Sequence, residues 1–275
     1  MHEFVSLNGN ISPNSEVNHS VISNASLYGK GVFTTIAIRN SKPFLWQLHW
    51  RRLTRDAGLL GIDLTDYSMD EVRQLLEAII DTNRCDSARC RITFFDDSAS
   101  EIWTNTTNSK TTLLIQTADS RVFEEPVALT MSPYPINSSS PTAGVKSCNY
   151  LENILAIEEA RSRGFFEAVR INERNEVASA SMANVFWEKD GKLYTPSLGT
   201  GCLAGTMREL ILQKLEAFEV EAELSVLENA DSIFLSSAGI GIVQVGKFND
   251  RELECTSEEL MKNLGLDLGY STPAA

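Results

Sequence analysis

The stretch that most constrains this chain runs from Lys146 to Phe186. Lys146 precedes an expected helix over Leu151–Arg163, and an apolar run over Ala168–Ile171 reads as a strand. A lysine amine attacks a carbonyl only when it is neutral, which requires burial or a neighbouring cation. A lysine set against such elements is a candidate for holding a cofactor with a carbonyl group. A solvated loop lysine is the alternative interpretation.

Composition favours a protein of one large or two ordinary domains. The chain has 275 residues, 43% hydrophobic and 22% charged, which is enough for a sizeable core. No apolar run is long enough to cross a bilayer, and the N-terminus lacks the basic flank and apolar block of a signal peptide. The formal net charge of −13 argues against a nucleic-acid partner. We therefore expect a cytoplasmic protein that binds neither membrane nor nucleic acid.

The cysteines predict a reduced protein without a metal site. There are five, scattered along the chain: Cys85, Cys90, Cys148, Cys202 and Cys255. An odd number at these spacings fits neither a disulfide framework nor paired zinc knuckles.

The first half of the chain predicts strands and two helices. A glycine-punctuated loop, Ser26–Gly31, runs into a β-branched strand over Val32–Arg39. Apolar residues at helical spacing predict a helix over Gln47–Leu60, and Ser68 with Glu71 forms a capping box that opens a second helix. Two further strands are expected, at Arg89–Phe94 and Thr112–Gln116.

The segment Asp119–Pro126 is polar and contains a proline, so it is the predicted connection between two domains. The first domain would comprise residues 1–118 and the second residues 127–275. In the second, Asp190-Gly191 predicts a hairpin turn, and Thr206 and Glu209 stand at capping-box spacing near a helix start. The other expected elements are strands at Val127–Ser132, Asp231–Leu235 and Ile240–Val245, and a terminal helix at Glu258–Leu264.

Five short motifs follow one another along the chain. They are Tyr-Gly-x-Gly-Val-Phe-Thr-Thr at Tyr28–Thr35, His-x-x-Arg-Leu at His49–Leu53, Lys-x-x-Asn-Tyr-Leu at Lys146–Leu151, Ala-Asn-Val-Phe at Ala183–Phe186, and Gly-x-Met-Arg at Gly205–Arg208. Each is weak alone, but together, in this order, they resemble the fold-type IV pyridoxal-phosphate enzymes, the class IV aminotransferase family. That family includes branched-chain aminotransferases, D-amino-acid aminotransferases and 4-amino-4-deoxychorismate lyases.

The resemblance implies an α+β fold of two domains. The N-terminal domain would be a small α/β domain, and the larger C-terminal domain would bind pyridoxal 5'-phosphate with barrel-like sheets. It also implies a homodimer, in which the small domain of one subunit closes the site of the other, and a small amino-acid-like substrate.

The resemblance assigns roles to individual residues. Lys146 matches the lysine that binds the cofactor covalently and moves the substrate proton. Arg52 matches the arginine that grips the cofactor phosphate, a task suited to a planar cation. Thr35 lies beside the reactive lysine in the lyase branch, and Tyr28 matches a pocket wall. The remaining cofactor positions are the helix start Gly205, Thr206 and Met207, the loop residues Ser237 and Ala238, and Ser179.

Each role has a plainer alternative. Arg52 could be a surface arginine on an amphipathic helix, and Tyr28 could belong to the core. Thr206 could cap a helix, which is compatible with phosphate binding because both use the same free N–H groups. We expect His49 to be a packed or capping residue.

Two positions depart from the family pattern. Relatives carry a glutamate five residues before the asparagine of Asn-x-Phe, where it pairs with the pyridine nitrogen; here that position is Ser179. A hydroxyl leaves the ring largely neutral, which we expect to weaken transamination more than elimination. Glu176 is a less favoured substitute. The Arg-Gly that many relatives carry after the strand at Arg89–Phe94 is also missing, which argues against D-amino-acid specificity.

Arg89 and Arg91 remain candidates for binding the substrate carboxylate. Strand alternation puts them on the same face, but the sequence does not say which way that face points.

The sequence favours a lyase. Phe33-Thr34-Thr35 resembles the deoxychorismate lyases, whereas aminotransferases more often have a glutamate after the phenylalanine. The reaction would remove the substrate α-proton and release pyruvate and 4-aminobenzoate, a step in folate biosynthesis that aromatisation drives. A class IV aminotransferase acting on a branched-chain or other amino acid is the alternative, and a non-catalytic paralogue is the third.

Overall fold

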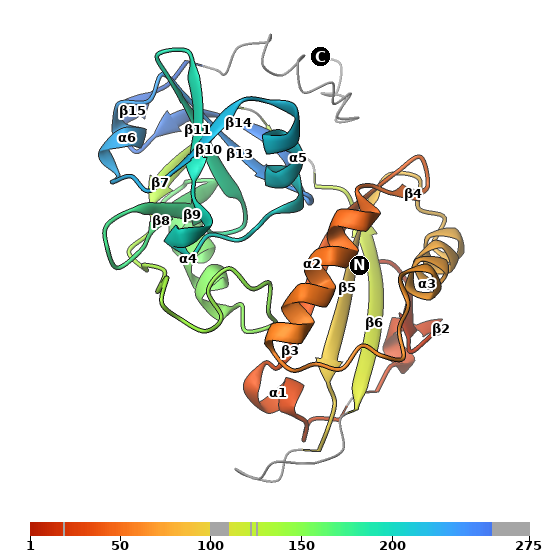
Figure 1. Cartoon of the computed structure of the whole chain (residues 1–275). Coiled ribbons are helices and arrows are strands. Elements are labelled where there is room, and N and C mark those ends of the chain that lie inside the picture. Colours follow the sequence, from red (N-terminus) through yellow and green to blue (C-terminus); the bar gives the residue numbers. More distant parts are fainter. Residues whose placement is uncertain (19, 100–109, 122, 125, 255–275) are drawn as a thin grey trace. The chain divides into compact units, whose positions relative to one another are not determined.

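The computed structural model describes residues 1–254, apart from residues 19, 100–109, 122 and 125. The chain divides into two compact units (Figure 1). Unit 1 comprises Met1–Arg121 and Val145–Asn149, and unit 2 comprises Val122–Gly144 and the chain from Tyr150 onward. Lys146 therefore belongs to compact unit 1, although it follows the first segment of unit 2 in the sequence. The expected boundaries at residues 118 and 127 stay a prediction, and the terminal helix expected at Glu258–Leu264 lies outside the described residues, as does Cys255.

Unit 1 contains a six-stranded antiparallel sheet with the strand order β2-β1-β6-β5-β3-β4. The strands are β1 (Phe4–Leu7), β2 (Asn10–Pro13), β3 (Gly31–Arg39), β4 (Lys42–Pro43), β5 (Ala88–Asp96) and β6 (Thr111–Asp119). The helices are α1 (Asn24–Tyr28), α2 (Trp46–Leu59) and α3 (Met69–Thr82), with a 3-10 turn, η1, at Asn14–Glu16.

Strand β3 divides its side chains between the two faces of this sheet. Val32 and Ile36 join the hydrophobic core that includes Leu53 of α2. Thr34, which lies between them on the same side, hydrogen-bonds to α2. Phe33 and Thr35 therefore project from the opposite face. This alternation separates two groups of polar residues in the candidate site.

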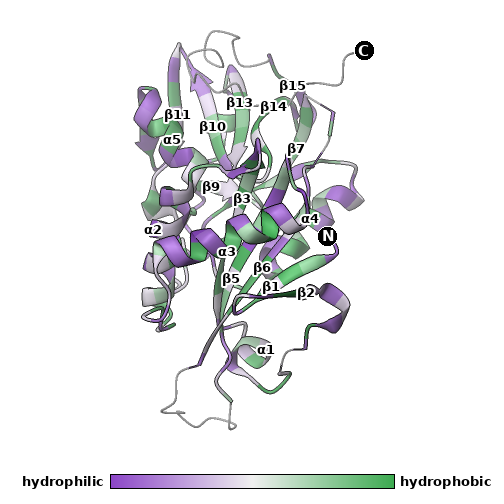
Figure 2. Ribbon diagram, turned by 90° about the vertical axis from the view of Figure 1, so that its right-hand side faces the viewer, coloured by the Kyte–Doolittle hydropathy of each residue, from purple (hydrophilic) through white to green (hydrophobic). Residues whose placement is uncertain are grey.

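Helix α3 begins at the predicted capping box. The Ser68 hydroxyl accepts from the backbone N–H of Glu71 at 3.2 Å, and the Glu71 carboxylate accepts from the N–H of Ser68 at 3.0 Å. Hydrophobic and hydrophilic residues alternate along the helix, as expected for an amphipathic element (Figure 2). Its apolar stripe of Val72, Leu76 and Ile79 is fully buried.

Unit 2 contains a mixed sheet with the path β12-β11-β10-β13-β14-β7-β8-β9, and β15 pairs with β14. The strands are β7 (Val127–Met131), β8 (Glu167–Ile171), β9 (Val177–Ala180), β10 (Asn184–Lys189), β11 (Lys192–Pro196), β12 (Ala217–Val220), β13 (Ser232–Ser237), β14 (Gly241–Phe248) and β15 (Arg251–Glu252). The helices are α4 (Leu151–Ser162), α5 (Thr206–Lys214) and α6 (Ser225–Glu228), with a 3-10 turn, η2, at Leu198–Thr200.

The sheet of unit 2 curls like half a barrel. The N–H of Ala180, at the end of β9, donates to the carbonyl of Ala183 at 2.9 Å, directly before β10. This tight turn joins β9, which ends the path, to β10, the third strand from the other end. The predicted hairpin is also present, with Asp190 and Gly191 in the left-handed region between β10 and β11.

In the described part of the chain, no helix has both the length and the apolar composition that crossing a bilayer requires.

Candidate functional site

Lys146 is fixed by its backbone along the edge of β3 in unit 1. The N–H of Phe33 donates to the carbonyl of Lys146 at 3.0 Å, and the N–H of Cys148 donates to the carbonyl of Gly31 at 2.8 Å. The N–H of Lys146 itself donates to the Asp56 carboxylate of α2 at 3.0 Å. Three hydrogen bonds to two elements leave the lysine backbone little freedom.

The close approach of this segment explains the glycine at the start of β3. A Cβ atom on Gly31 would lie 2.9 Å from the sulfur of Cys148 and 3.0 Å from the carbonyl oxygen of Phe94. The first distance is shorter than real Cβ contacts and the second is tighter than most of them, so packing favours glycine at the last position of the Tyr-Gly-x-Gly motif.

The amine of Lys146 is placed where protonation is unfavourable. The residue is half-buried, and its Nζ lies 4.4 Å from the centroid of the buried Phe33 ring. Burial, followed by the charges of Arg52 and Arg91, holds the pKa of Lys146 well below its usual value, and Asp56 opposes this shift. The amine is therefore prepared to act as a neutral nucleophile or base.

The structure separates the two candidate arginines of β5. The Arg91 guanidinium stacks over the Phe33 ring, with its carbon 3.6 Å from the centroid, and Nζ of Lys146 lies 4.4 Å from the same centroid. Arg89 donates from Nε to the carbonyl of Asp119 at 3.0 Å, towards the other end of the strand. Arg91 is thus the arginine beside the lysine.

The other unit 1 candidates differ in how deeply they are buried. Thr35 faces Arg91 across the β3–β5 ladder and projects to the same side as Phe33. Arg52 is buried, with 7% of its surface exposed, so it is not a surface arginine. Tyr28, at the end of α1, is 49% exposed and does not belong to the core.

In unit 2, α5 begins at Thr206 with Gly205 as its N-cap. The predicted alternative in which Thr206 caps the helix is wrong, because the N-cap lies one residue earlier and Thr206 is already helical. A Cβ on Gly205 would lie 2.0 Å from Oδ1 of Asn184, whose Nδ2 donates to the carbonyl of Leu203 at 2.8 Å. Asn184 thereby fixes the entry into α5, whose first N–H groups and positive dipole end favour an anion.

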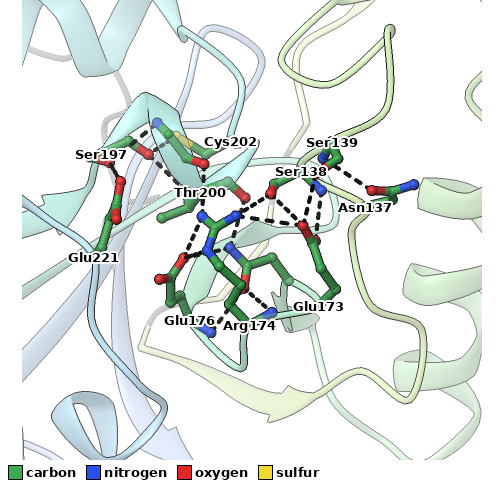
Figure 3. A network of polar contacts seen from close by, with 12 residues as sticks. Asn137, Ser138, Ser139, Glu173, Arg174, Glu176, Ser197, Thr200, Cys202 and Glu221 are labelled. Atoms are coloured by element: carbon green, nitrogen blue, oxygen red, sulfur yellow. Dashed lines mark hydrogen bonds and ion pairs between the residues drawn. The ribbon is translucent and has the colours of Figure 1, made fainter.

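Ser179 lies in β9, 7% exposed, opposite the buried Arg170 in the β8–β9 ladder. Glu176 does not take its place, because its carboxylate is bound within the preceding turn. Arg174 donates to it at 2.7 Å and Asn172 at 2.7 Å (Figure 3). Ser237 ends β13, Ala238 begins the tight turn that follows, and Met207 is buried in the first turn of α5.

These arrangements can be compared with known proteins. The model of the amino-transferase class IV family matches residues 31–248. The chain belongs to this family. The predicted α+β fold, the fold-type IV aminotransferase fold, is thereby confirmed.

Three relatives illustrate the range of this class IV family. The chain is 28% identical to an aminodeoxychorismate lyase of Bacillus subtilis, over 87% of this chain and 85% of that protein. It is 28% identical to a probable branched-chain-amino-acid aminotransferase of Rickettsia felis, over 87% and 84%. The 4-amino-4-deoxychorismate lyase of Pseudomonas aeruginosa superimposes with a TM-score of 0.85 at 21% identity, covering 97% and 100%.

A polar network supports the loop that leads into α5 (Figure 3). Arg174 donates to the Ser138 hydroxyl at 2.7 Å and to the carbonyl of Gly199 at 3.0 Å. Glu173 accepts from the N–H and hydroxyl of Ser138 at 2.8 and 2.7 Å, and these bonds lower the pKa of its carboxyl to about 2. The network joins three loops of unit 2 and holds the chain just before Gly205.

Sequence reasoning missed two buried carboxylates in this class IV enzyme, Asp56, which accepts from the N–H of Lys146, and Glu167. Glu167, on β8, accepts from the N–H groups of Ala168 and Ser181 at 3.0 Å and of Met182 at 3.1 Å. Burial nevertheless raises its pKa. It shapes the turn before Asn184, and no local pattern signals it, because two of its partners lie on a distant part of the chain.

Proposed function

We propose that this class IV enzyme uses pyridoxal 5'-phosphate, bound at Lys146, to cleave 4-amino-4-deoxychorismate into 4-aminobenzoate and pyruvate. The observation that carries the proposal is the placement of the Lys146 amine, 4.4 Å from the centroid of the Phe33 ring that the Arg91 guanidinium also covers. Burial and the charges of Arg52 and Arg91 hold the pKa of this amine below its usual value. A lysine retained only for packing has no need of that environment, which disfavours the non-catalytic alternative.

The residues of each unit fit the chemical groups of this cofactor. Lys146 offers a neutral amine to its aldehyde, and Arg52 offers a buried cation to its phosphate. In unit 2, the N-terminus of α5 at Gly205 offers N–H groups to the same kind of anion. The proposed cofactor-binding residues of unit 2 also include Thr206, Met207, Ser237 and Ala238. Ser179 offers a hydroxyl to the pyridine nitrogen. A carboxylate at this position would instead keep a proton on that nitrogen.

When bound, this cofactor supplies an electron-accepting ring that stabilises the charge left by removal of the α-proton. Lys146 takes that proton at Nζ, which requires the neutral amine described above. Arg91 binds a substrate carboxylate and holds it beside Lys146, over the apolar surface of Phe33. Thr35 offers its hydroxyl to the part of the substrate that leaves as pyruvate, and Tyr28 forms part of the pocket wall.

The lyase is preferred over the aminotransferase for two reasons. Thr35, the last residue of the lyase-like Phe33-Thr34-Thr35 run, stands on the face that carries Phe33 and Arg91. Ser179 supplies no negative charge, and aromatisation of the product reduces the demand on the ring as an electron acceptor.

The test is to incubate the protein with pyridoxal 5'-phosphate and 4-amino-4-deoxychorismate, following pyruvate with a coupled dehydrogenase and 4-aminobenzoate by fluorescence. The two products should appear in equal amounts. Amino transfer from branched-chain amino acids to 2-oxoglutarate without pyruvate release would instead establish the second candidate, which the 28% identity to the Rickettsia felis protein supports.

We also propose a cytoplasmic homodimer. Helix α4 exposes three apolar residues at helical spacing, namely Leu151 (63%), Ile154 (38%) and Leu155 (45%). A subunit contact would remove this stripe from water, and light scattering on the purified protein tests it by mass.

A further inference from the structure

A cluster of polar side chains lies on the helix-covered face of the unit 1 sheet. Three polar side chains meet there beside the apolar core: Thr34 of β3, and His49 and Arg52, one turn apart on α2. Thr34 and His49 are fully buried and Arg52 is 7% exposed. Polar groups removed from water in this way are costly unless they bond to one another.

The Thr34 hydroxyl lies between the two α2 residues. Its Oγ1 is 2.8 Å from Nη2 of Arg52 and 2.6 Å from Nδ1 of His49. We call this arrangement, Arg52–Thr34–His49, the hydroxyl bridge.

The chemistry of the guanidinium fixes the direction of its bond to Thr34. A guanidinium can only donate, so the oxygen of Thr34 accepts from Arg52. The same hydroxyl is shared with Nδ1 of His49, to which it donates in the tautomer protonated at Nε2.

The surroundings of His49 keep its imidazole uncharged. Burial, followed by the charges of Arg52 and Lys146, holds the pKa of His49 well below its usual value. One ring nitrogen therefore remains an acceptor at neutral pH, and the ring adds no positive charge beside Arg52.

We propose that Thr34 and His49 are positioning residues that orient the Arg52 guanidinium for the cofactor phosphate. This inference rests on the proposed function, in which Arg52 binds that phosphate. A planar guanidinium with one nitrogen fixed by a buried acceptor has lost its rotational freedom before the anion arrives. His49 holds the Thr34 hydroxyl in place, and where Nδ1 accepts its proton the oxygen that faces Arg52 is also polarised.

The position of Thr34 within the motif agrees with this role. The Phe33-Thr34-Thr35 run sends its first and third side chains to the face of Lys146 and its second to α2. One short strand segment thus serves both faces. The histidine of His-x-x-Arg-Leu, for which the sequence predicts packing or capping, supports the arginine of the same motif.

The test compares two ligands that differ only in the phosphate. Apo-protein is titrated with pyridoxal 5'-phosphate and with pyridoxal, following the absorbance of the lysine adduct. Thr34→Val removes the hydroxyl without changing the shape of the side chain. We expect this variant to bind pyridoxal 5'-phosphate about tenfold more weakly, the effect of losing one hydrogen bond to a charged group. Its affinity for pyridoxal should be unchanged. Thr34→Ser, which keeps the hydroxyl, should restore wild-type affinity.

Thr54→Val is the matched control, because the Thr54 hydroxyl bonds to backbone carbonyls of its own helix, at Trp50 and Arg51. If Thr34→Val does not fold, His49→Leu and His49→Asn replace it. The asparagine oxygen can still accept from Thr34, whereas leucine cannot, so only His49→Leu should lose affinity for pyridoxal 5'-phosphate.

If Thr34→Val binds both ligands more weakly to the same extent, or binds neither more weakly, the positioning role is overturned while the proposed function remains intact. Failure of the wild-type protein to bind pyridoxal 5'-phosphate would instead refute the proposed function itself.

Discussion

The amide oxygen of Asn184 stands 2.0 Å from the point where a Cβ of Gly205 would lie. The motifs Ala183–Phe186 and Gly205–Arg208 are separated in the sequence but therefore pack against each other, with the asparagine amide directly against the glycine. The same amide donates to the carbonyl of Leu203, so the backbone that enters α5 is held on both sides.

Gly205→Ala should therefore displace the start of α5. We expect a loss of about 1–3 kcal/mol in the unfolding free energy of unit 2, typical of overpacking, and weaker binding of pyridoxal 5'-phosphate. Urea denaturation and cofactor titration measure the two effects. Gly58→Ala, within α2 and with no atom within 4 Å of its Cβ, is the control and should leave both unchanged or slightly improved.

Arg91→Met should raise the pKa of Lys146, because one of the charges that lower it is removed. A smaller fraction of the amine is then neutral at any given pH below the pKa. The rate at which apo-protein captures pyridoxal 5'-phosphate should thus rise with pH over a range shifted upward from that of the wild type.

The KM for substrate should also increase by about tenfold or more, as expected when a charge-assisted bond to a carboxylate is lost. Arg89→Met removes the same charge from the same strand, but away from Lys146. An equal shift in that variant would show that the effect of Arg91 is not local.

Ser179→Glu should increase transamination more than elimination. A carboxylate at this position can hold a proton on the pyridine nitrogen, and returning a proton to the cofactor carbon depends more on that electron demand. Both half-reactions are assayed on one preparation, with Ser179→Gln as the uncharged control. A gain in elimination alone would contradict this view of Ser179.

Glu173→Gln should destabilise the protein at neutral pH and lose this effect in acid. The folded-state pKa of about 2 lies below the ordinary 4.5, so the carboxylate stabilises the fold fully above 4.5 and progressively less as the pH falls towards 2. Urea midpoints of variant and wild type should converge over that range. Glu158→Gln, on the exposed side of α4, provides the comparison, and a pH-independent difference would exclude the linkage.

Local signals in the sequence predicted local structure. Ser68 and Glu71 bond to each other three residues apart, and Asp190-Gly191 turns a hairpin by its own backbone preference, so both could be predicted. The helix start near Gly205 was also predicted, but its N-cap residue was not, because the cap is decided by Asn184, whose position relative to Gly205 depends on the completed fold.

In the candidate site, too, the sequence did not predict features that depend on contacts between distant parts of the chain. Motif order led to Lys146 and Arg52, but the choice between Arg89 and Arg91 required the register of β3 against β5. The role of His49 required a contact between a helix and a strand fifteen residues away. Glu167 had no signal, because a single glutamate followed by apolar residues is common on any strand.

The most direct test of the account is to reduce the protein with borohydride in the presence of pyridoxal 5'-phosphate and to locate the product by mass spectrometry of tryptic peptides. We expect one phosphopyridoxyl group per chain, attached to Lys146, and none in Lys146→Ala. Modification spread over surface lysines, or none at all, would contradict the claim that this amine is the one that binds the cofactor.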